Sequence, residues 1–158
     1  MALVDAMCLG VCCLGRYNSR VTALPRASVL VRTWFGDDGA WESLVLEVRT
    51  PSDEGFLANV TVVNDAAFED LSAGALQTRQ TGGAIVSFIA DETTLVSAER
   101  PILAVWVLPR RDDDRRDLRP FRVVPAALWS VENNLNLGNM DWADFTRSVD
   151  GDGVFRGF

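Results

Sequence analysis

Acidic residues stand directly after three stretches of the sequence that we predict to be strands. In chain order they are Asp37 and Asp38 after residues 28–35, Asp65 after residues 59–63, and Asp91 and Glu92 after residues 84–90. If the three strands are parallel, their carboxyl ends meet at one edge of the sheet, where open α/β sheets bind ligands. Carboxylates gathered at such an edge can hold Mg²⁺ for phosphoryl chemistry. The candidate metal ligands are therefore Asp38, Asp65, Asp91 and Glu92, with Glu92 also a candidate general base.

The same aspartates have a second interpretation that requires no metal ion. Each of them stands just before a predicted helix or turn, which is the N-cap position, where an Asp side chain accepts a backbone N–H bond. Capping explains each Asp separately and does not require the side chains to converge. The sequence alone leaves both interpretations open.

Two residue types that carry much of enzyme chemistry are absent. The chain contains no His, and all 15 of its basic residues are Arg, so it contains no Lys. These absences exclude nucleophile systems that depend on His, Schiff-base lysines, the lysine of phosphate-binding P-loops and zinc sites that contain His. Acid–base chemistry is left to Asp, Glu, one Tyr and three Cys.

Two further groups of side chains could contact a ligand. Asn133, Asn134 and Asn139 could line a polar pocket, although Asn also favours helix ends because of its own side-chain hydrogen bonds. Trp129 lies beside the predicted apolar stripe of its helix, so it is a candidate exposed contact. The run Asp150-Gly-Asp-Gly lacks the later ligands of a calcium loop, so we predict a turn there.

Residues 1–23 differ in character from the rest and are predicted to be an N-terminal extension, either flexible or a short helix. Their apolar part carries Cys8, Cys12 and Cys13. This spacing is not that of a metal knuckle, and three cysteines in one cluster favour a reducing compartment. The apolar run is too short to span a bilayer, and its positive charges follow it, which is unlike a secretion signal.

The stretch Ile102–Leu108 is the central element of the predicted fold. Seven apolar residues without alternation are typical of a strand covered on both faces, and Pro101 and Pro109 mark its limits. A strand of this kind requires helices above and below it. Only about ten residues separate it from the preceding predicted strand, so these two strands could be antiparallel.

The remaining elements alternate in a way that favours an α/β fold for residues 24–158. Strands at 28–35, 59–63 and 84–90 are separated by predicted helices, and two helices, the first opened by Pro125, follow Phe121–Val124. We therefore predict a mostly parallel central sheet of about five strands with helices on both faces. Residues 121–124 are predicted to form its last strand, an antiparallel edge. A chain of 158 residues can bury such a core without disulfides.

Several motifs resemble those of a known protein family. They are Ser28–Phe35 with Asp37, Asp38 and Trp41, Asp91–Thr94, Phe121–Pro125, Trp129–Leu135, Asn139–Asp141 and Asp152–Phe158. Together they are similar to a family of small acidic proteins, found mainly in actinobacteria, that carries a domain of unknown function. The resemblance covers about Leu24 to Phe158. It implies one domain over that range and no activity, cofactor or catalytic residue.

These observations lead to two hypotheses about function. The first is a soluble, cytoplasmic, non-catalytic binding or interaction module without a cofactor, whose partner is another protein or a small ligand. The second is a Mg²⁺-dependent phosphoesterase or a related hydrolase that uses the acidic cluster. The net charge of −7 argues against nucleic acid as a partner, because phosphate binding requires a basic surface. No membrane-spanning segment is expected.

Overall fold

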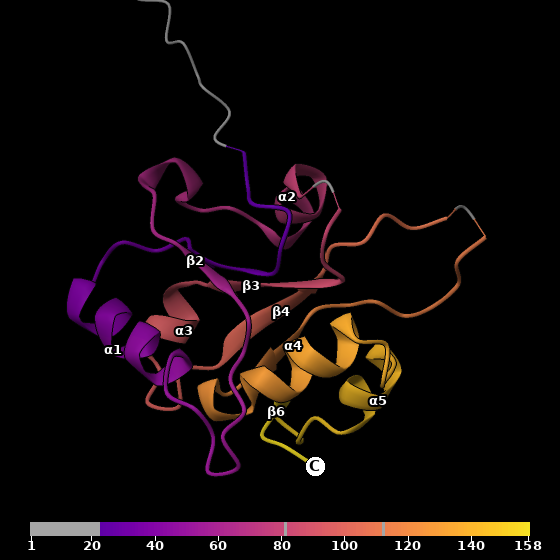
Figure 1. Ribbon diagram of the computed structural model, residues 1–158. Helices are drawn as coiled ribbons and strands as arrows, with labels where there is room; N and C mark the ends of the chain where they lie inside the picture. Colours follow the sequence, from indigo (N-terminus) through magenta and orange to yellow (C-terminus); the bar gives the residue numbers. More distant parts are fainter. Residues whose placement is uncertain (1–22, 81, 112) are drawn as a thin grey trace, which may run out of the picture.

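A six-stranded sheet forms the centre of the protein, in a computed structural model that describes residues 23–80, 82–111 and 113–158 (Figure 1). The order of its strands across the sheet is β2-β1-β3-β4-β5-β6. In chain order the strands are β1 (Val29–Arg32), β2 (Thr61–Val63), β3 (Val86–Ala90), β4 (Ile102–Trp106), β5 (Phe121–Val123) and β6 (Val154–Phe155).

The strand directions confirm a mostly parallel sheet and settle the orientation of its central strand. β1 pairs in parallel with both β2 and β3, and β6 pairs in parallel with β5. β4 is antiparallel to both of its neighbours, so it alone runs against the other five strands. Its residues Val105 and Trp106 are buried, as a strand covered on both faces requires.

The prediction that residues 121–124 form the edge strand of the sheet was wrong. β5 does run antiparallel to β4, but it is not an edge strand, because the two residues of β6 pair with Arg122 and Val123 beyond it. The sheet therefore has six strands rather than five. β6 is too short, and too close to glycines, to give a strand pattern of its own in the sequence.

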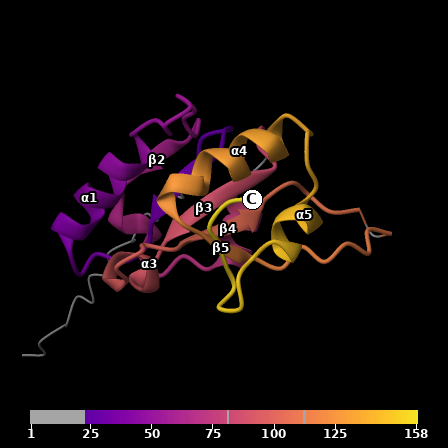
Figure 2. The ribbon, with the colours of Figure 1, turned by 90° about the horizontal axis from the view of Figure 1, so that it is seen from below.

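Helices cover both faces of the sheet. The helical segments are α1 (Asp38–Val48), η1 (Ala66–Phe68), α2 (Ala73–Arg79), α3 (Glu92–Val96), η2 (Pro125–Ala127), α4 (Leu128–Asn136) and α5 (Trp142–Arg147). Apolar side chains of α1, α3, α4 and α5 pack in one cluster on one face of the sheet. Side chains of η1 and α2 pack in a second cluster on the other face. Figure 2 looks onto the face that carries the first of these clusters, and it shows α1 and α4 in front of the sheet. Among the described residues, no helix is long and apolar enough to cross a membrane.

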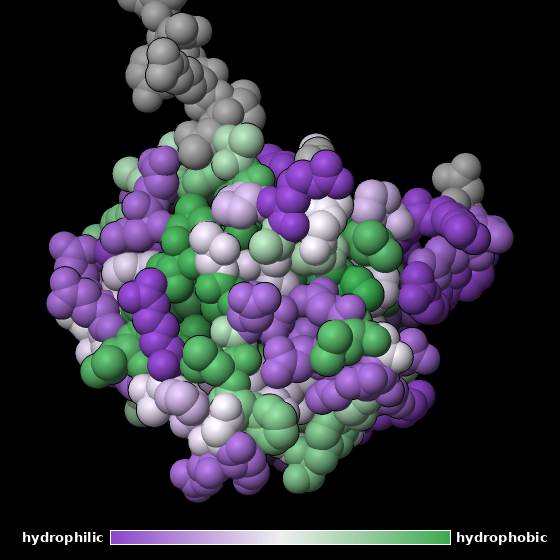
Figure 3. Space-filling model, viewed as in Figure 1, coloured by the Kyte–Doolittle hydropathy of each residue, from purple (hydrophilic) through white to green (hydrophobic). Residues whose placement is uncertain are grey.

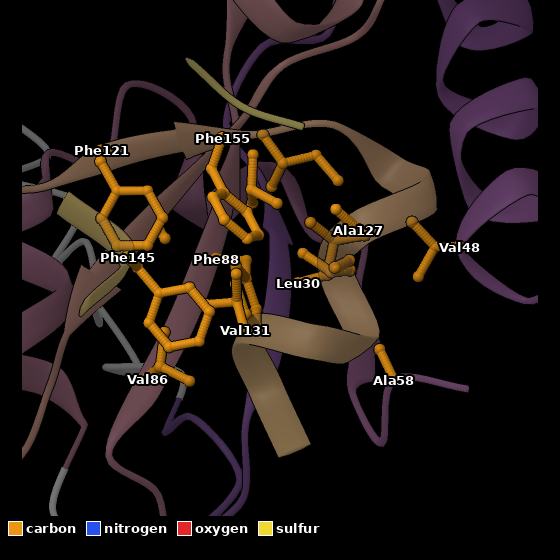
Figure 4. Packing of buried hydrophobic residues seen from close by; sticks show 14 of the residues in the cluster. Leu30, Val48, Ala58, Val86, Phe88, Phe121, Ala127, Val131, Phe145 and Phe155 are labelled. Carbon is orange, nitrogen blue, oxygen red and sulfur yellow. The ribbon is translucent and has the colours of Figure 1, made fainter. Parts of the chain in front are cut away.

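The larger cluster buries one apolar face of each of its longer helices. Trp41, Leu44 and Val48 of α1 are buried, and so are Val131 and Leu135 of α4. Figure 4 shows that one end of this core is formed by small side chains, where Val48 and Ala58 approach Ala127. Aromatic rings fill the opposite end, where Phe145 lies against Phe121 and Phe155.

The second predicted helix is divided in the structure. Phe68 ends the short 3-10 segment η1, and α2 begins only at Ala73. Between them Asp70 takes a positive φ of 57°, which an α-helix does not permit. Each piece has its own cap, because Asp65 and Ser72 accept backbone N–H bonds at their respective starts. A short helix, α3, also occupies the link that was expected to be a plain connection.

Candidate functional site

The acidic residues do lie at one edge of the sheet, because β1, β2 and β3 are parallel. Three of them act there as helix caps. Asp37 accepts the backbone N–H of Ala40 at 2.9 Å, and Asp65 and Asp91 accept equivalent bonds at the starts of η1 and α3. The capping interpretation is therefore confirmed for these three aspartates.

Two of the carboxylates at this edge also pair with arginines. Asp38 pairs with the buried Arg32 at 2.8 Å, and Asp91 pairs with Arg122 at 2.6 Å. Burial would raise the pKa of Asp91, but hydrogen bonds from Arg122 and from the Thr94 backbone outweigh it and hold that pKa below its ordinary value. Glu92 is exposed on the first turn of α3.

The structure does not gather the candidate metal ligands into one site. Across residues 23–80, 82–111 and 113–158, no group of three or more His, Cys, Asp or Glu side chains could hold a metal ion. The Mg²⁺ hypothesis for Asp38, Asp65, Asp91 and Glu92 gains no support from this geometry and stays a prediction.

Arg32, which the sequence did not single out, is the most buried charged side chain at this edge. Its residue is 2% exposed, and its Nη2 is the one buried side-chain nitrogen or oxygen without a hydrogen-bond partner among the described residues. The guanidinium lies 4.6 Å from the ring centre of Phe35 and 5.6 Å from that of Trp41. The negative ring faces stabilise the cation there.

The three asparagines proposed to line a polar pocket lie near the end of α4 and just beyond it, and their contact with a ligand stays a prediction. Asn139 donates its backbone N–H to the carbonyl oxygen of Asn134 at 2.9 Å, and the two side chains meet at 3.4 Å. The carbonyl oxygen of Asn133 accepts the N–H of Leu137 at the end of α4. None of these three lines either pocket described below. Cys8, Cys12 and Cys13, and the predicted extension 1–23 up to residue 22, lie outside the described residues.

A pocket of about 460 Å³ opens between the last turn of α1, loop 49–58 and the first turn of α4. Trp129 and Phe56 form one wall, with ring centres 4.5 Å apart and planes inclined by 14°. Phe56 is 48% exposed, and Trp129 is half-buried. The volume is within the range of small-ligand pockets, roughly 300–1,000 Å³. Trp129 thus lies at a pocket wall rather than on an open surface.

Loop 49–58 holds Phe56 in place through a closed turn. The backbone N–H of Ser52 donates to the carbonyl oxygen of Phe56 at 2.8 Å, and the Ser52 hydroxyl oxygen accepts the N–H of Phe56. Gly55 lies between them with a φ of +84°, a conformation that side chains with a Cβ disfavour. The turn therefore presents the Phe56 ring to Trp129 in a defined position.

A buried carboxylate joins the end of this loop to α4. Glu132 is 4% exposed, and its Oε2 accepts the backbone N–H of Asn59 at 2.9 Å. Its Oε1 accepts from the side-chain amide of Asn136 at 2.7 Å. Asn136 in turn accepts from the backbone N–H of Ile85 and donates to the hydroxyl of Ser28. This network fixes α4, and with it Trp129, to two strands and to the loop.

The pocket is acidic. Its lining includes Glu47, Asp53 and Glu54 and no Arg. Glu47 is paired with Arg100, whereas neither Asp53 nor Glu54 forms an ion pair with any residue that the structure describes. Figure 3 shows hydrophobic residues on the surface between α1 and α4 and hydrophilic ones at the tip of loop 49–58. Two carboxylates at the rim of an apolar pocket favour a positively charged ligand group.

A second hollow of about 300 Å³ continues from the first. The two share Glu47, Pro125 and Ala126, and the second also contains Arg100 and Arg156. Arg156 pairs with Glu99, Asp150 and Asp152 at 2.6–2.8 Å, and its hydrogen bonds hold the pKa of Glu99 and of Asp152 below their ordinary values. The Asp150–Gly153 run is therefore a turn held by an arginine, as predicted.

The loop that forms the pocket was not among the candidate sites predicted from the sequence. The available signal was the pair Phe56 and Leu57, two large apolar side chains that follow the polar run Thr50–Gly55. Both are more than 40% exposed. An aromatic residue in a polar loop is a common feature of binding sites.

Comparison with known proteins places the chain in a family. A comparison with curated proteins finds no match. A family described as a domain of unknown function, DUF6924, matches residues 27–158, which is most of the chain. On this finding, the chain belongs to the DUF6924 family.

Proposed function

We propose that this protein is a non-catalytic, cytoplasmic binding module whose pocket between α1 and α4 receives a side chain of a protein partner. The observation that carries the proposal is the stacked pair Phe56 and Trp129 at the wall of a 460 Å³ pocket. Exposing half of a Phe ring to water is unfavourable, by roughly 25 cal/mol for each Å² of apolar surface. Aromatic side chains that line a pocket are typical anchoring points for a partner.

The chemistry of the lining supports binding rather than catalysis. The lining residues include no His, Cys, Lys or Tyr among those that the structure describes, and Glu47 already has a partner. General acid–base catalysis requires a group whose pKa is tuned to its task by its surroundings. Asp53 and Glu54 are exposed to solvent rather than held against a buried reaction site. Shape and charge are what this pocket offers to a ligand.

The proposal is tested by NMR titration of the full-length ¹⁵N-labelled protein with capped single amino acids. N-acetyl methylamides of Leu, Phe, Trp and Arg serve as probes. We expect at least one probe to cause saturable shifts confined to residues 47–58 and 125–129. Trp129→Ala should abolish them, and Phe56→Ala, which alters only an exposed loop, should do the same without affecting the fold.

Leu137→Ala is the control, because it removes an apolar side chain that is 74% exposed and lies outside the pocket lining. It should leave the shifts unchanged. The proposal is wrong if no saturable shifts appear either with these four probes or with short peptides that carry such side chains, or if the shifts persist in both Trp129→Ala and Phe56→Ala.

A further inference from the structure

Resting on the proposed function, we propose that the pocket binds an arginine side chain within an extended peptide segment of the partner protein. The charge of the pocket is complementary to that of an arginine. Glu47, Asp53 and Glu54 line the pocket and no basic residue does. A cation entering it meets two carboxylates that have no counter-ion among the described residues, at a protein surface whose net charge is −7. Opposite charge at the rim also steers association.

The aromatic wall of the pocket favours arginine over other cations. A planar guanidinium stacks on aromatic rings more readily than a hydrated ammonium does, and its three-carbon stem can pack on apolar surface. The protein uses this contact elsewhere, because Arg116 lies 4.8 Å from the ring centre of Trp106 and Arg79 lies 5.7 Å from that of Phe68. The half-exposed ring of Phe56 offers a similar surface, with carboxylates within the same lining.

The shape of the pocket favours a ligand longer than a single amino acid. The pocket is not closed at its far side but continues, past Pro125 and Ala126, into the second hollow. That hollow contains Arg100 and Arg156 together with Glu47 and Glu99, so it suits a polar main chain rather than a second cation. A free small cation would occupy the first pocket alone. A peptide can place an arginine side chain in the first pocket while its backbone extends along both the pocket and the second hollow.

The experiment compares three capped pentapeptides of the form Ala-Ala-X-Ala-Ala, in which X is arginine, citrulline or glutamate. Citrulline has nearly the shape of arginine without its charge. Dissociation constants are measured by NMR titration of the full chain at low salt. The arginine peptide should bind about fivefold or more tightly than the citrulline peptide, and the glutamate peptide should bind most weakly. The arginine peptide should also bind more tightly than N-acetylarginine methylamide, which cannot reach the second hollow.

Matched variants locate the charge effect. Asp53→Asn with Glu54→Gln should weaken the arginine peptide about fivefold while leaving the citrulline peptide unchanged. Glu42→Gln with Glu69→Gln changes the net charge equally at exposed residues outside the pocket lining, and should leave both unchanged.

The outcomes separate this inference from the proposed function. Equal binding of the arginine and citrulline peptides overturns the inference while the pocket still binds ligands. If the arginine peptide and the capped single arginine bind with equal affinity, the claim that the ligand is an extended peptide segment is wrong. If no peptide and no capped amino acid binds at residues 47–58 and 125–129, the proposed function itself is wrong.

Discussion

Replacing Glu132 by Gln is expected to destabilise the protein and loosen its pocket. The substitution keeps the size of the side chain but exchanges one carboxylate oxygen for an NH₂ donor. In the native protein both oxygens accept, one from the backbone of Asn59 and one from Asn136. One of these two donors must therefore face another donor in the variant.

The neighbouring amide cannot relieve this conflict by turning over. Asn136 uses its oxygen to accept the N–H of Ile85 at 2.8 Å and its nitrogen to donate to Ser28 at 2.8 Å. Turning the Asn136 amide would break both bonds. A lost hydrogen bond to a charged group costs about 1.5–3 kcal/mol, and a buried donor left unsatisfied costs about 1–3 kcal/mol. Because the Asn59 end of the network is near solvent, we expect a total loss of about 2–3 kcal/mol.

The free energy of unfolding is measured by urea denaturation, followed by tryptophan fluorescence, for the native protein and Glu132→Gln. Amide hydrogen exchange of residues 49–59 reports the loop, and should become faster in the variant. Glu42→Gln, at an exposed position on α1, is the control and should stay within about 0.5 kcal/mol of the native protein. A Glu132→Gln loss below about 0.5 kcal/mol would refute the reasoning.

Three other substitutions test the fold. Gly83→Ala should cost about 3 kcal/mol or more, because Gly83 has a φ of +93° and a Cβ there would collide with the carbonyl oxygen of Arg26. Thermal melting measures this loss. Phe145→Ala should cost about 3–5 kcal/mol in urea denaturation, because its ring is fully buried. Asp91→Asn keeps a cap for α3 but removes the charge that pairs with Arg122, so it should cost about 1 kcal/mol at pH 7. The lowered pKa of Asp91 stabilises the native state above the ordinary value of 3.8, and this contribution disappears as the pH falls from there through the lowered pKa. The difference between native and Asp91→Asn protein should therefore narrow below about pH 4.

Each of these has its own control. Gly151→Ala meets open space without a positive φ and should be tolerated. Phe158→Ala removes a ring that is 73% exposed, so it should cost much less than Phe145→Ala, and an equal cost would contradict the burial argument. For Asp91→Asn, a stability difference that stays constant from pH 7 to pH 3 would mean that the ion pair with Arg122 contributes nothing.

The central strand was predictable because its signal is local. The apolar run between Pro101 and Pro109 predicts a strand covered on both faces, and the structure bears this out for Ile102–Trp106, whereas Leu108 lies beyond the strand and is exposed. Its direction was left open, since about ten residues can make either kind of link. α3 takes up five of those residues, and what remains is too short for a crossover, so β4 returns antiparallel to β3.

The last strand and the pocket were not predictable for the opposite reason. β6 consists of Val154 and Phe155, which become a strand only because β5 supplies their hydrogen-bond partners. The pocket likewise combines residues 47–58 with residues 125–129, segments that the sequence keeps far apart. The helix caps could be proposed from the sequence because capping involves neighbours such as Asp37 and Ala40. No single-sequence pattern joins Phe56 to Trp129.

The hydrogen bond between Ser28 and Asn136 spans 108 positions of the chain. It links the start of β1 to the last turn of α4, so it exists only when the first and last parts of the domain are both folded. The amide protons of Val29 and Ile85 are held in the same set of bonds, to Ser87 and to Asn136. Both should exchange with solvent only through global opening, with the same free energy of opening, and a fragment that ends before α4 should not retain this end of the sheet.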